Sequence, residues 1–322
     1  MNFKGYKRPG FYGPIGLCLL MGGFISTPSV YAQENESIYQ IIQLDSITIQ
    51  AEKAGFDVDD FIDLVIRDKS FYEAFRHLRT TTYSFENRIF IFDRKNIEVA
   101  SYKSLARQFY QSPCRYMAEA NKVVQGNFFT KKGDYNYYTA KLYDRMFFTH
   151  DTVCISQEDL TFSNEKDPQG MEKHVGELKK LIFTPGKKAN VPLIGHKTAI
   201  FEKEMLPYYD YLIGSDTLNG QPSYLFTVRT KEEFRDHQEG KTIIKNLQTW
   251  FAKGNLQILK RRYTLAARTL LYHFTVDMDI DLIKVGEIYY PQTISYEGIW
   301  KLASKKTERA KFTIGFSQFK NH

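Results

Sequence analysis

The sequence is poor in the features that define several classes of protein. It has only 3 cysteines and 2 tryptophans in 322 residues, and no segment after residue 32 is both long and free of charge. A chain of this length with 43% hydrophobic residues can bury a sizeable core. Disulfide-dense miniproteins, collagen-like repeats and disordered chains are therefore excluded.

Motifs that identify a reaction are also missing. The chain has no Gly-x-Ser-x-Gly elbow, no phosphate-binding glycine loop, no His-Glu-x-x-His pair and no EF-hand loop. Its 7 histidines are widely separated, so a metal site would require distant loops to converge. The sequence predicts a protein that is not an enzyme and has no metal or cofactor. A hydrolase built from scattered Asp, Glu and His side chains is the alternative.

The N-terminus has the three-part pattern of a cleaved secretory signal peptide. Basic residues within 1–8 precede an apolar run at 15–25, and Ala32 stands before Gln33. The run is about half the ~20 residues that a membrane-spanning helix needs. We expect a signal peptide at 1–32 and a periplasmic protein whose contact with the outer membrane is at most peripheral. A short N-terminal anchor is the alternative.

The charge of the mature chain is small. Loss of the leader, with its three basic and no acidic residues, lowers the net charge from +7 to +4. The positive charges are also scattered among acids, which argues against nucleic acid as a partner. The one tight basic cluster is Lys260, Arg261 and Arg262. We interpret it as a solvated strand face, with contact to anionic lipid as the alternative.

Two cysteines, Cys114 and Cys154, remain after cleavage, an even number in an oxidising compartment. We predict that they form a disulfide, which would stabilise the fold by about 4 kcal/mol in the chain-entropy model. Two buried free thiols are the alternative.

The segment after the leader divides into two parts. We expect 33–56 to be an N-terminal segment with a short strand, and 57–322 to be a single domain. Within 57–79, apolar residues recur at helical spacing, which predicts one amphipathic helix or two. Ser70 and Glu73 fit a capping box for a second helix. A further amphipathic helix is expected at 171–182, and 138–148 is interpreted as a strand passing into a short helix.

From residue 81 onward the hydrophobic period changes from helical to two. Asn219 and Gly220 lie between two apolar runs and predict a hairpin, because both tolerate positive φ. The alternation is clearest in 270–282, where one face is apolar and the other carries carboxylates. Long strands with one apolar face must close or curl around something apolar. We therefore predict an α+β fold, mainly antiparallel β, in which a curved half-barrel sheet is capped by amphipathic helices.

The candidate site residues lie on these strands. The tryptophans are assigned to the wall of a ligand cavity because an amphipathic ring suits a lipid boundary, with core packing as the alternative. The carboxylates of Asp277, Asp279 and Asp281 are expected to pair across strands with Lys260 or Arg262, or to face water, rather than to bind calcium. The cavity-wall candidates are Trp250, Tyr272, Phe274, Val276, Met278 and Trp300.

Two segments resemble a known superfamily. The hairpin at 215–228, followed by 247–261, looks like the strand, polar turn, strand pair of the LolA/LolB-like carriers of outer-membrane lipoproteins. The match departs from that pattern at Ala252, where an acidic residue often stands. The chain also resembles uncharacterised Gram-negative envelope proteins that share a leader and a Tyr-Tyr-Pro…Tyr-x-Gly-x-Trp ending.

The resemblance implies an unclosed β-barrel whose concave face holds acyl chains, and a protein that is not enzymatic. It thus names lipid or a lipoprotein acyl chain as the ligand, with envelope proteins as further partners. The alternative is an envelope interaction module whose apolar sheet face is filled by its own helices.

Overall fold

The computed structural model describes residues 57–154, 181–188, 195–235, 240–268, 272–302 and 307–320. All of them belong to one of two compact units, Tyr39–His322. The expected leader, the N-terminal segment and most of the helix expected at 171–182 lie outside the described residues.

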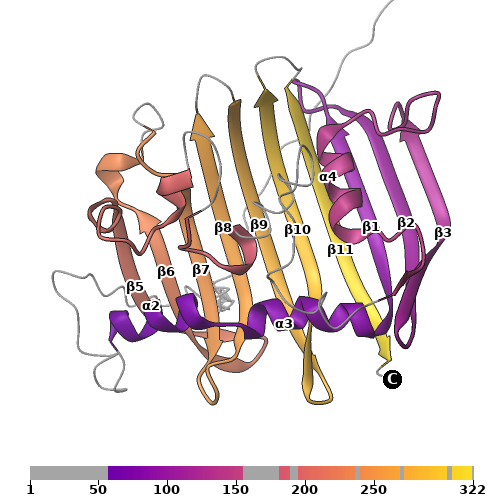
Figure 1. Cartoon of the computed structure of the whole chain (residues 1–322). Helices are drawn as coiled ribbons and strands as arrows, with labels where there is room; N and C mark the ends of the chain where they lie inside the picture. Colours follow the sequence, from indigo (N-terminus) through magenta and orange to yellow (C-terminus); the bar gives the residue numbers. More distant parts are fainter. Residues whose placement is uncertain are drawn as a thin grey trace, which may run out of the picture. The chain divides into compact units, whose positions relative to one another are not determined.

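The described strands form one antiparallel sheet of 11 strands in the order β4-β3-β2-β1-β11-β10-β9-β8-β7-β6-β5 (Figure 1). Strands that follow each other in sequence are neighbours, except β4 and β5, which are the two edges of the sheet. The first strand, β1, also pairs with the last, β11. The sheet is therefore a barrel left open between β4 and β5. The strands are β1 Thr82–Phe92, β2 Glu98–Gln111, β3 Cys114–Gly126, β4 Val153–Cys154, β5 Tyr209–Leu218, β6 Gln221–Thr230, β7 Ile244–Ala252, β8 Ile258–Arg268, β9 Tyr272–Val285, β10 Ile288–Leu302 and β11 Glu308–Lys320.

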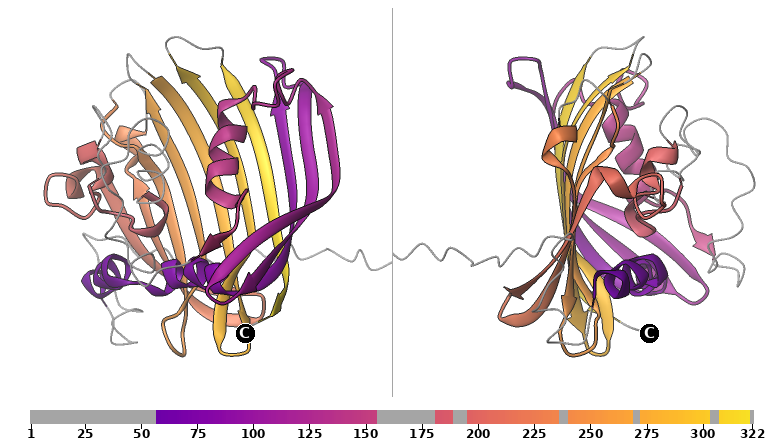
Figure 2. Two further views of the ribbon diagram at one scale, coloured as in Figure 1. Left: turned by 45° about the vertical axis from the view of Figure 1, so that its right-hand side comes forward. Right: turned by 90° about the vertical axis from the view of Figure 1, so that its left-hand side faces the viewer.

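Helices cover one face of this sheet. The indigo helices α2 and α3 run across one end of the strands, and the magenta α4 lies beside β11 on the same side (Figure 2). The predicted class, a mainly antiparallel α+β fold with a curved, open sheet and a helical cap, is confirmed. The helices are α2 Val58–Arg67, α3 Ser70–His77 and α4 Tyr138–Phe147, with single 3-10 turns η2 Leu78–Thr80, η4 Gly195–Thr198, η5 Leu206–Tyr208 and η6 Glu232–Phe234.

The segment 57–79 forms two helices, and each has a side-chain cap. At α2, Asp57 and Asp60 cap each other through two backbone-to-carboxylate hydrogen bonds of 2.9 Å. At α3 the predicted Ser70–Glu73 capping box is wrong. Asp68 supplies the cap instead, because its two carboxylate oxygens accept the backbone N–H groups of Ser70 at 3.2 Å and Phe71 at 3.0 Å.

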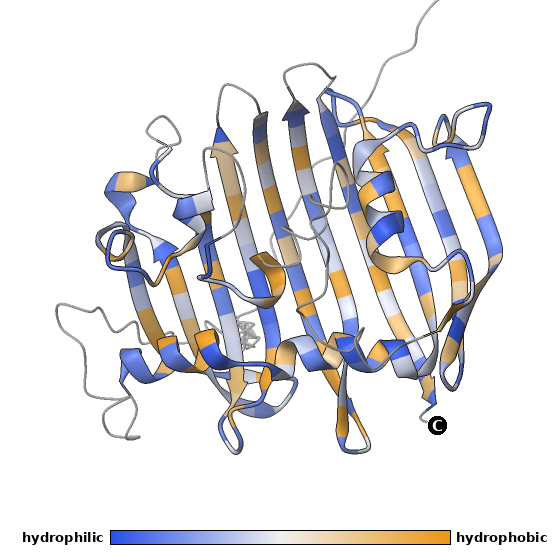
Figure 3. Cartoon of the chain, in the orientation of Figure 1, coloured by the Kyte–Doolittle hydropathy of each residue, from blue (hydrophilic) through white to orange (hydrophobic). Residues whose placement is uncertain are grey.

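Hydrophobic and polar residues alternate along the strands, so that the sheet has an apolar and a polar face (Figure 3). The helix-covered face is the apolar one. On the opposite face the predicted pairing of strand carboxylates is confirmed. Asp279 lies 2.9 Å from Arg262 and 3.1 Å from Lys260, and Asp281 lies 2.9 Å from Lys260. The hydroxyl of Thr264 donates to Asp277 at 2.7 Å.

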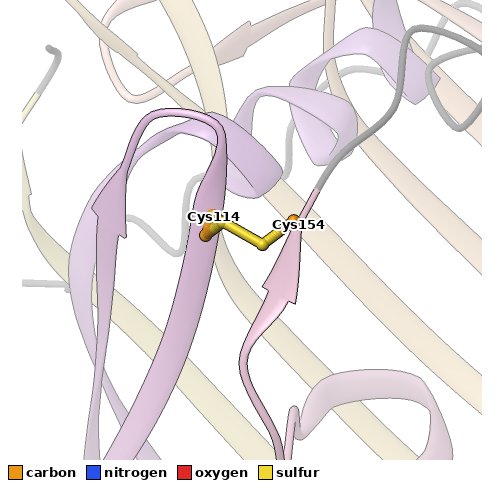
Figure 4. Close-up of a disulfide and its surroundings, with 2 residues drawn as sticks. All are labelled: Cys114 and Cys154. Carbon is orange, nitrogen blue, oxygen red and sulfur yellow. A yellow bond between two sulfur atoms is a disulfide. The ribbon is translucent and has the colours of Figure 1, made fainter.

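The predicted turn between β5 and β6 is also present. Asn219 and Gly220 have φ values of 51° and 81°, the left-handed conformation for which these residue types are suited. The predicted disulfide is confirmed as well. It joins Cys114 of β3 to Cys154 of β4 across a sequence separation of 40 residues (Figure 4).

Helix α4 begins at Tyr138, where the sequence indicated a strand. Its N-cap residue makes no side-chain cap, and the sheet supplies one. The carboxylate of Glu308, the first residue of β11, accepts the N–H groups of Tyr138 at 2.8 Å and Thr139 at 2.7 Å. A carboxylate at a helix N-terminus satisfies free N–H groups and interacts favourably with the helix dipole. Glu308 thus ties α4 to the sheet.

We expect Glu308→Ala to lower the free energy of unfolding by about 2 kcal/mol, because two charge-assisted hydrogen bonds to the helix terminus are lost. Urea unfolding measures the change. The matched control is Glu297→Ala, which removes an exposed ion pair of 2.8 Å with Lys311 and should cost less than about 1 kcal/mol. Equal effects of the two substitutions would contradict the assigned role of Glu308.

Candidate functional site

The apolar face of β9 carries three of the candidate residues. Phe274, Val276 and Met278 alternate with Thr275 and Asp277, so they point to one side of the sheet. Phe274 and Val276 are buried, with exposed fractions of 6% and 4%, whereas Met278 is only half-buried. These residues belong to or pack against the main hydrophobic core, which also contains residues of α2 and α3.

Trp300 of β10 links this group to a row of aromatic rings that leads to α4. Its ring stacks on Phe274 with centroids 4.8 Å apart, and its indole N–H donates to the hydroxyl of Tyr296 at 2.6 Å. Tyr296 stacks in turn on Phe312 at 4.6 Å. Phe312 meets Tyr143 of α4 edge to face at 4.9 Å. The rings therefore form a continuous aromatic row from β9 to α4, and Phe274, Phe312 and Tyr143 in it are buried.

The tyrosine hydroxyls in this row are neutral. Burial raises the pKa of Tyr296, and burial together with nearby carboxylate and phenol groups raises the pKa of Tyr143. Tyr143 donates its hydroxyl hydrogen bond to the side-chain oxygen of Asn87, whose amide donates to Ser104 at 3.2 Å. The Tyr143 hydroxyl donates a hydrogen bond and the Tyr296 hydroxyl accepts one from Trp300, and both bonds hold the rings in place.

Trp250 lies on the opposite face of the sheet. Its neighbour Phe251 contacts Phe61 of α2 with ring centroids 5.7 Å apart, and successive strand residues point to opposite faces. The Trp250 indole N–H donates to Asp216 at 2.7 Å, and the ring lies 5.9 Å from the ammonium of Lys260. It belongs to a separate small cluster with Leu225, Ala252 and Leu259. One cavity cannot be lined by both Trp250 and the other candidates.

The last candidate, Tyr272, is the first residue of β9, and its side chain lies outside the described residues. Sequence reasoning missed the part played by Tyr296 and Tyr143. Tyr296 shares a strand face with Trp300, four residues away, which was a usable signal. No local pattern shows that α4 brings Tyr143 onto Phe312, because that contact depends on long-range packing.

A separate pocket of about 360 Å³ opens beside α2. Leu64, Phe251 and Leu256 provide apolar walls, and the carboxylates of Asp60 and Asp63 lie at the same pocket. Asp68 and Arg67 also line the pocket, and three carboxylates beside one guanidinium disfavour an anionic ligand there. The pocket is distinct from the aromatic row of β9 and β10, and it does not contain any of the candidate residues.

The candidate residues on β9 and β10 are apolar or aromatic. Among the described residues, no three His, Cys, Asp or Glu side chains are grouped so that they could hold a metal ion. No helix in the described ranges is long and apolar enough to cross a membrane. The structure therefore defines a class of fold: an open antiparallel sheet whose apolar face is covered by short helices.

No protein-family model and no curated protein matches the chain. Among solved structures, it is similar to a DUF1329 family protein from Desulfovibrio piger, at 13% identity and a TM-score of 0.22, over 84% of this chain and 92% of that one. It is also similar to a LolA superfamily protein from Nitrosomonas europaea, at 10% identity and a TM-score of 0.25, over 81% and 93% of the two chains. It is also similar to an outer membrane lipoprotein-sorting protein domain from Vibrio parahaemolyticus, at 8% identity and a TM-score of 0.23, over 76% of this chain and 88% of that one.

The LolA superfamily, which the sequence resembles, is thus represented among the similar structures. At these low TM-scores, the likenesses carry no inference about what this chain binds.

Proposed function

We propose that the chain is an exported, non-catalytic envelope protein, periplasmic or associated with the outer membrane, that binds a hydrophobic ligand on the helix-covered face. The ligand is a lipid or the acyl chain of a lipoprotein. The observation that carries the proposal is the state of Met278 and Trp300, which are only half-buried on a face that is otherwise apolar. Met278 of β9 pairs with Tyr296 of β10. That pair lies between the part of β10 that contacts α3, at Tyr289 and Tyr290, and Trp300, which contacts Tyr138 of α4.

The energetics of such a surface are sufficient for binding. Each buried CH₂ group of an acyl chain contributes about 0.8 kcal/mol, so ten groups contribute about 8 kcal/mol before the costs of association. Phe274, Met278 and Trp300 provide a wall of the right chemistry. The resemblance of 215–228 and 247–261 to the lipoprotein carriers supports the same class of ligand.

We expect Met278→Glu to weaken binding of a fluorescent fatty acid at least tenfold, because it places a carboxylate against the acyl chain in an apolar site. Fluorescence titration of the mature protein measures this. The matched control is Thr275→Glu on the other face of the same strand, which should leave the affinity unchanged. Urea unfolding of both variants separates lost binding from lost folding.

A second, uncharged substitution keeps the test decisive if Met278→Glu does not fold. Met278→Trp fills the same space with an apolar ring and should also weaken binding. Unchanged affinity in folded Met278 variants would rule out this part of the face as the binding surface.

An envelope interaction module is the second candidate, and one observation favours it. Apolar side chains are exposed on β2 and β3, near the β4 edge of the sheet, with exposed fractions of 42% for Leu105, 45% for Tyr116 and 51% for Val123. In the described part of the chain, the two-residue edge strand β4 covers β3 at Cys114 and Arg115 alone. This function predicts that no lipid binds and that Val123→Lys abolishes association with an envelope protein.

A further inference from the structure

Arg261 lies in an unusual position for an arginine. It is fully buried on β8, on the helix-covered face, and its guanidinium lies 4.4 Å from the centroid of the Phe71 ring of α3. This corrects the interpretation of Lys260, Arg261 and Arg262 as one solvated face. Alternation sends Lys260 and Arg262 to the polar face, where they pair with Asp279 and Asp281, and sends Arg261 to the apolar one.

The hydrogen-bonding capacity of Arg261 is largely unused. Its guanidinium donates through Nη1 to the backbone oxygen of Ile182 at 3.4 Å and also interacts with the Tyr263 hydroxyl. Its Nε and Nη2 have no hydrogen-bond partner in the described part of the chain. None of the described carboxylates forms an ion pair with it. Arginine stays protonated in proteins, and a buried charge without a counterion is costly. A buried arginine with free N–H donors is stabilised by an anion that accepts hydrogen bonds from them, so Arg261 is suited to bind an anion.

A second unpartnered group lies directly beside it. Thr249 of β7 is the cross-strand partner of Arg261, is fully buried, and has a hydroxyl with no hydrogen-bond partner among the described residues. Directly opposed residues of antiparallel strands share a face with Cα atoms about 4.5–5.5 Å apart. The carboxylate of Asp68 acts on the neighbouring Tyr263 and accepts the backbone N–H groups at the start of α3. The free donors of Arg261 and the hydroxyl of Thr249 therefore form one polar spot on an apolar face.

This polar spot lies at one end of the proposed acyl surface. Arg261 pairs with Ile280 of β9, and Met278, Val276 and Phe274 follow on the same face of that strand. The strand covers roughly 20 Å between Ile280 and Phe274. A ligand with a charged head at Arg261 and a tail along β9 would satisfy the buried donors and contact the apolar wall at once.

We propose that Arg261 and Thr249 bind the oxyanion head, a carboxylate or a phosphate, of an amphiphilic lipid whose acyl chain extends along β9 towards Phe274. The inference rests on the proposed function and specifies its ligand class. The planar guanidinium presents parallel N–H groups to two oxygens of the anion, and the threonine hydroxyl donates to one of them. Head-group charge is therefore a determinant of affinity at this site.

The test compares ligands with one tail and different heads. Dodecanoate, dodecyl phosphate and dodecanol are titrated by calorimetry into the mature wild-type protein and into Arg261→Met and Thr249→Val. We expect the wild type to bind an anionic ligand about 10- to 100-fold more tightly than dodecanol, the range for hydrogen bonds to a charged group. Arg261→Met should lose this preference while keeping its affinity for dodecanol, and Thr249→Val should lose part of it.

The other outcomes distinguish failure of the head-group site from failure of the proposed function. Equal wild-type affinity for all three ligands would overturn the head-group site while leaving the proposed function intact. Binding of none of them would overturn the proposed function itself. Inorganic phosphate titrated alone identifies the source of the anion, and binding as tight as that of dodecyl phosphate would contradict an amphiphile. If Arg261→Met does not fold, the wild-type comparison and the nearly isosteric Thr249→Val still decide the question.

Discussion

Replacing Phe61 with alanine is expected to lower the free energy of unfolding by about 3–5 kcal/mol, the range for truncating a phenylalanine in a well-packed core. The Phe61 ring is fully buried and lies 5.5 Å from Tyr224, 6.0 Å from Phe226 and 5.7 Å from Phe251, centroid to centroid. Through this ring α2 packs on β6 and β7. Urea unfolding of the mature protein measures the loss.

Asp63→Ala on the same helix is the matched control. Asp63 makes an exposed ion pair with Arg67 at 2.8 Å, and such pairs contribute at most about 1 kcal/mol. If Phe61→Ala cost no more than this control, α2 would not be packed on the sheet in solution. The apolar face would then be open at β6 and β7.

Replacing both cysteines, Cys114→Ser with Cys154→Ser, is expected to lower the free energy of unfolding by about 4 kcal/mol, because the unfolded chain regains the entropy of a closed loop. The loop spans a sequence separation of 40 residues. Changing both together avoids leaving one cysteine of the pair as a free thiol. The unfolding midpoint in urea, measured against the oxidised wild type, checks the value. A change below about 1 kcal/mol would show that the bond constrains little of the unfolded chain.

The sequence predicted features that depend on local spacing. The alternation in β9, the turn at Asn219 and Gly220 and the break between two helices after α2 each follow from one short stretch of chain. The cross-strand pairing of Asp279 with Arg262 was also predicted, because both residues lie on polar faces of long strands. These features together were enough to define the class of fold.

Features that depend on register or on distant residues were not predicted. The first N–H groups of α4 are capped by Glu308, which is far away in sequence. No local residue therefore signals the start of the helix, and a strand was expected there. A cluster of three basic residues was interpreted as one surface although strand geometry sends Arg261 inward. Trp250 was grouped with Trp300 because both are amphipathic, yet the two rings lie on opposite faces of the sheet.

The central claim, that the apolar face holds a lipid or acyl chain, is tested most directly by native mass spectrometry of the mature protein. The protein is purified from a Gram-negative periplasm, and bound lipid is extracted and identified. We predict a phospholipid, a fatty acid or an acylated peptide at close to one per chain. A clean mass of the protein alone, together with no binding of a fluorescent fatty acid, would contradict the account and favour an interaction module with a self-filled sheet face.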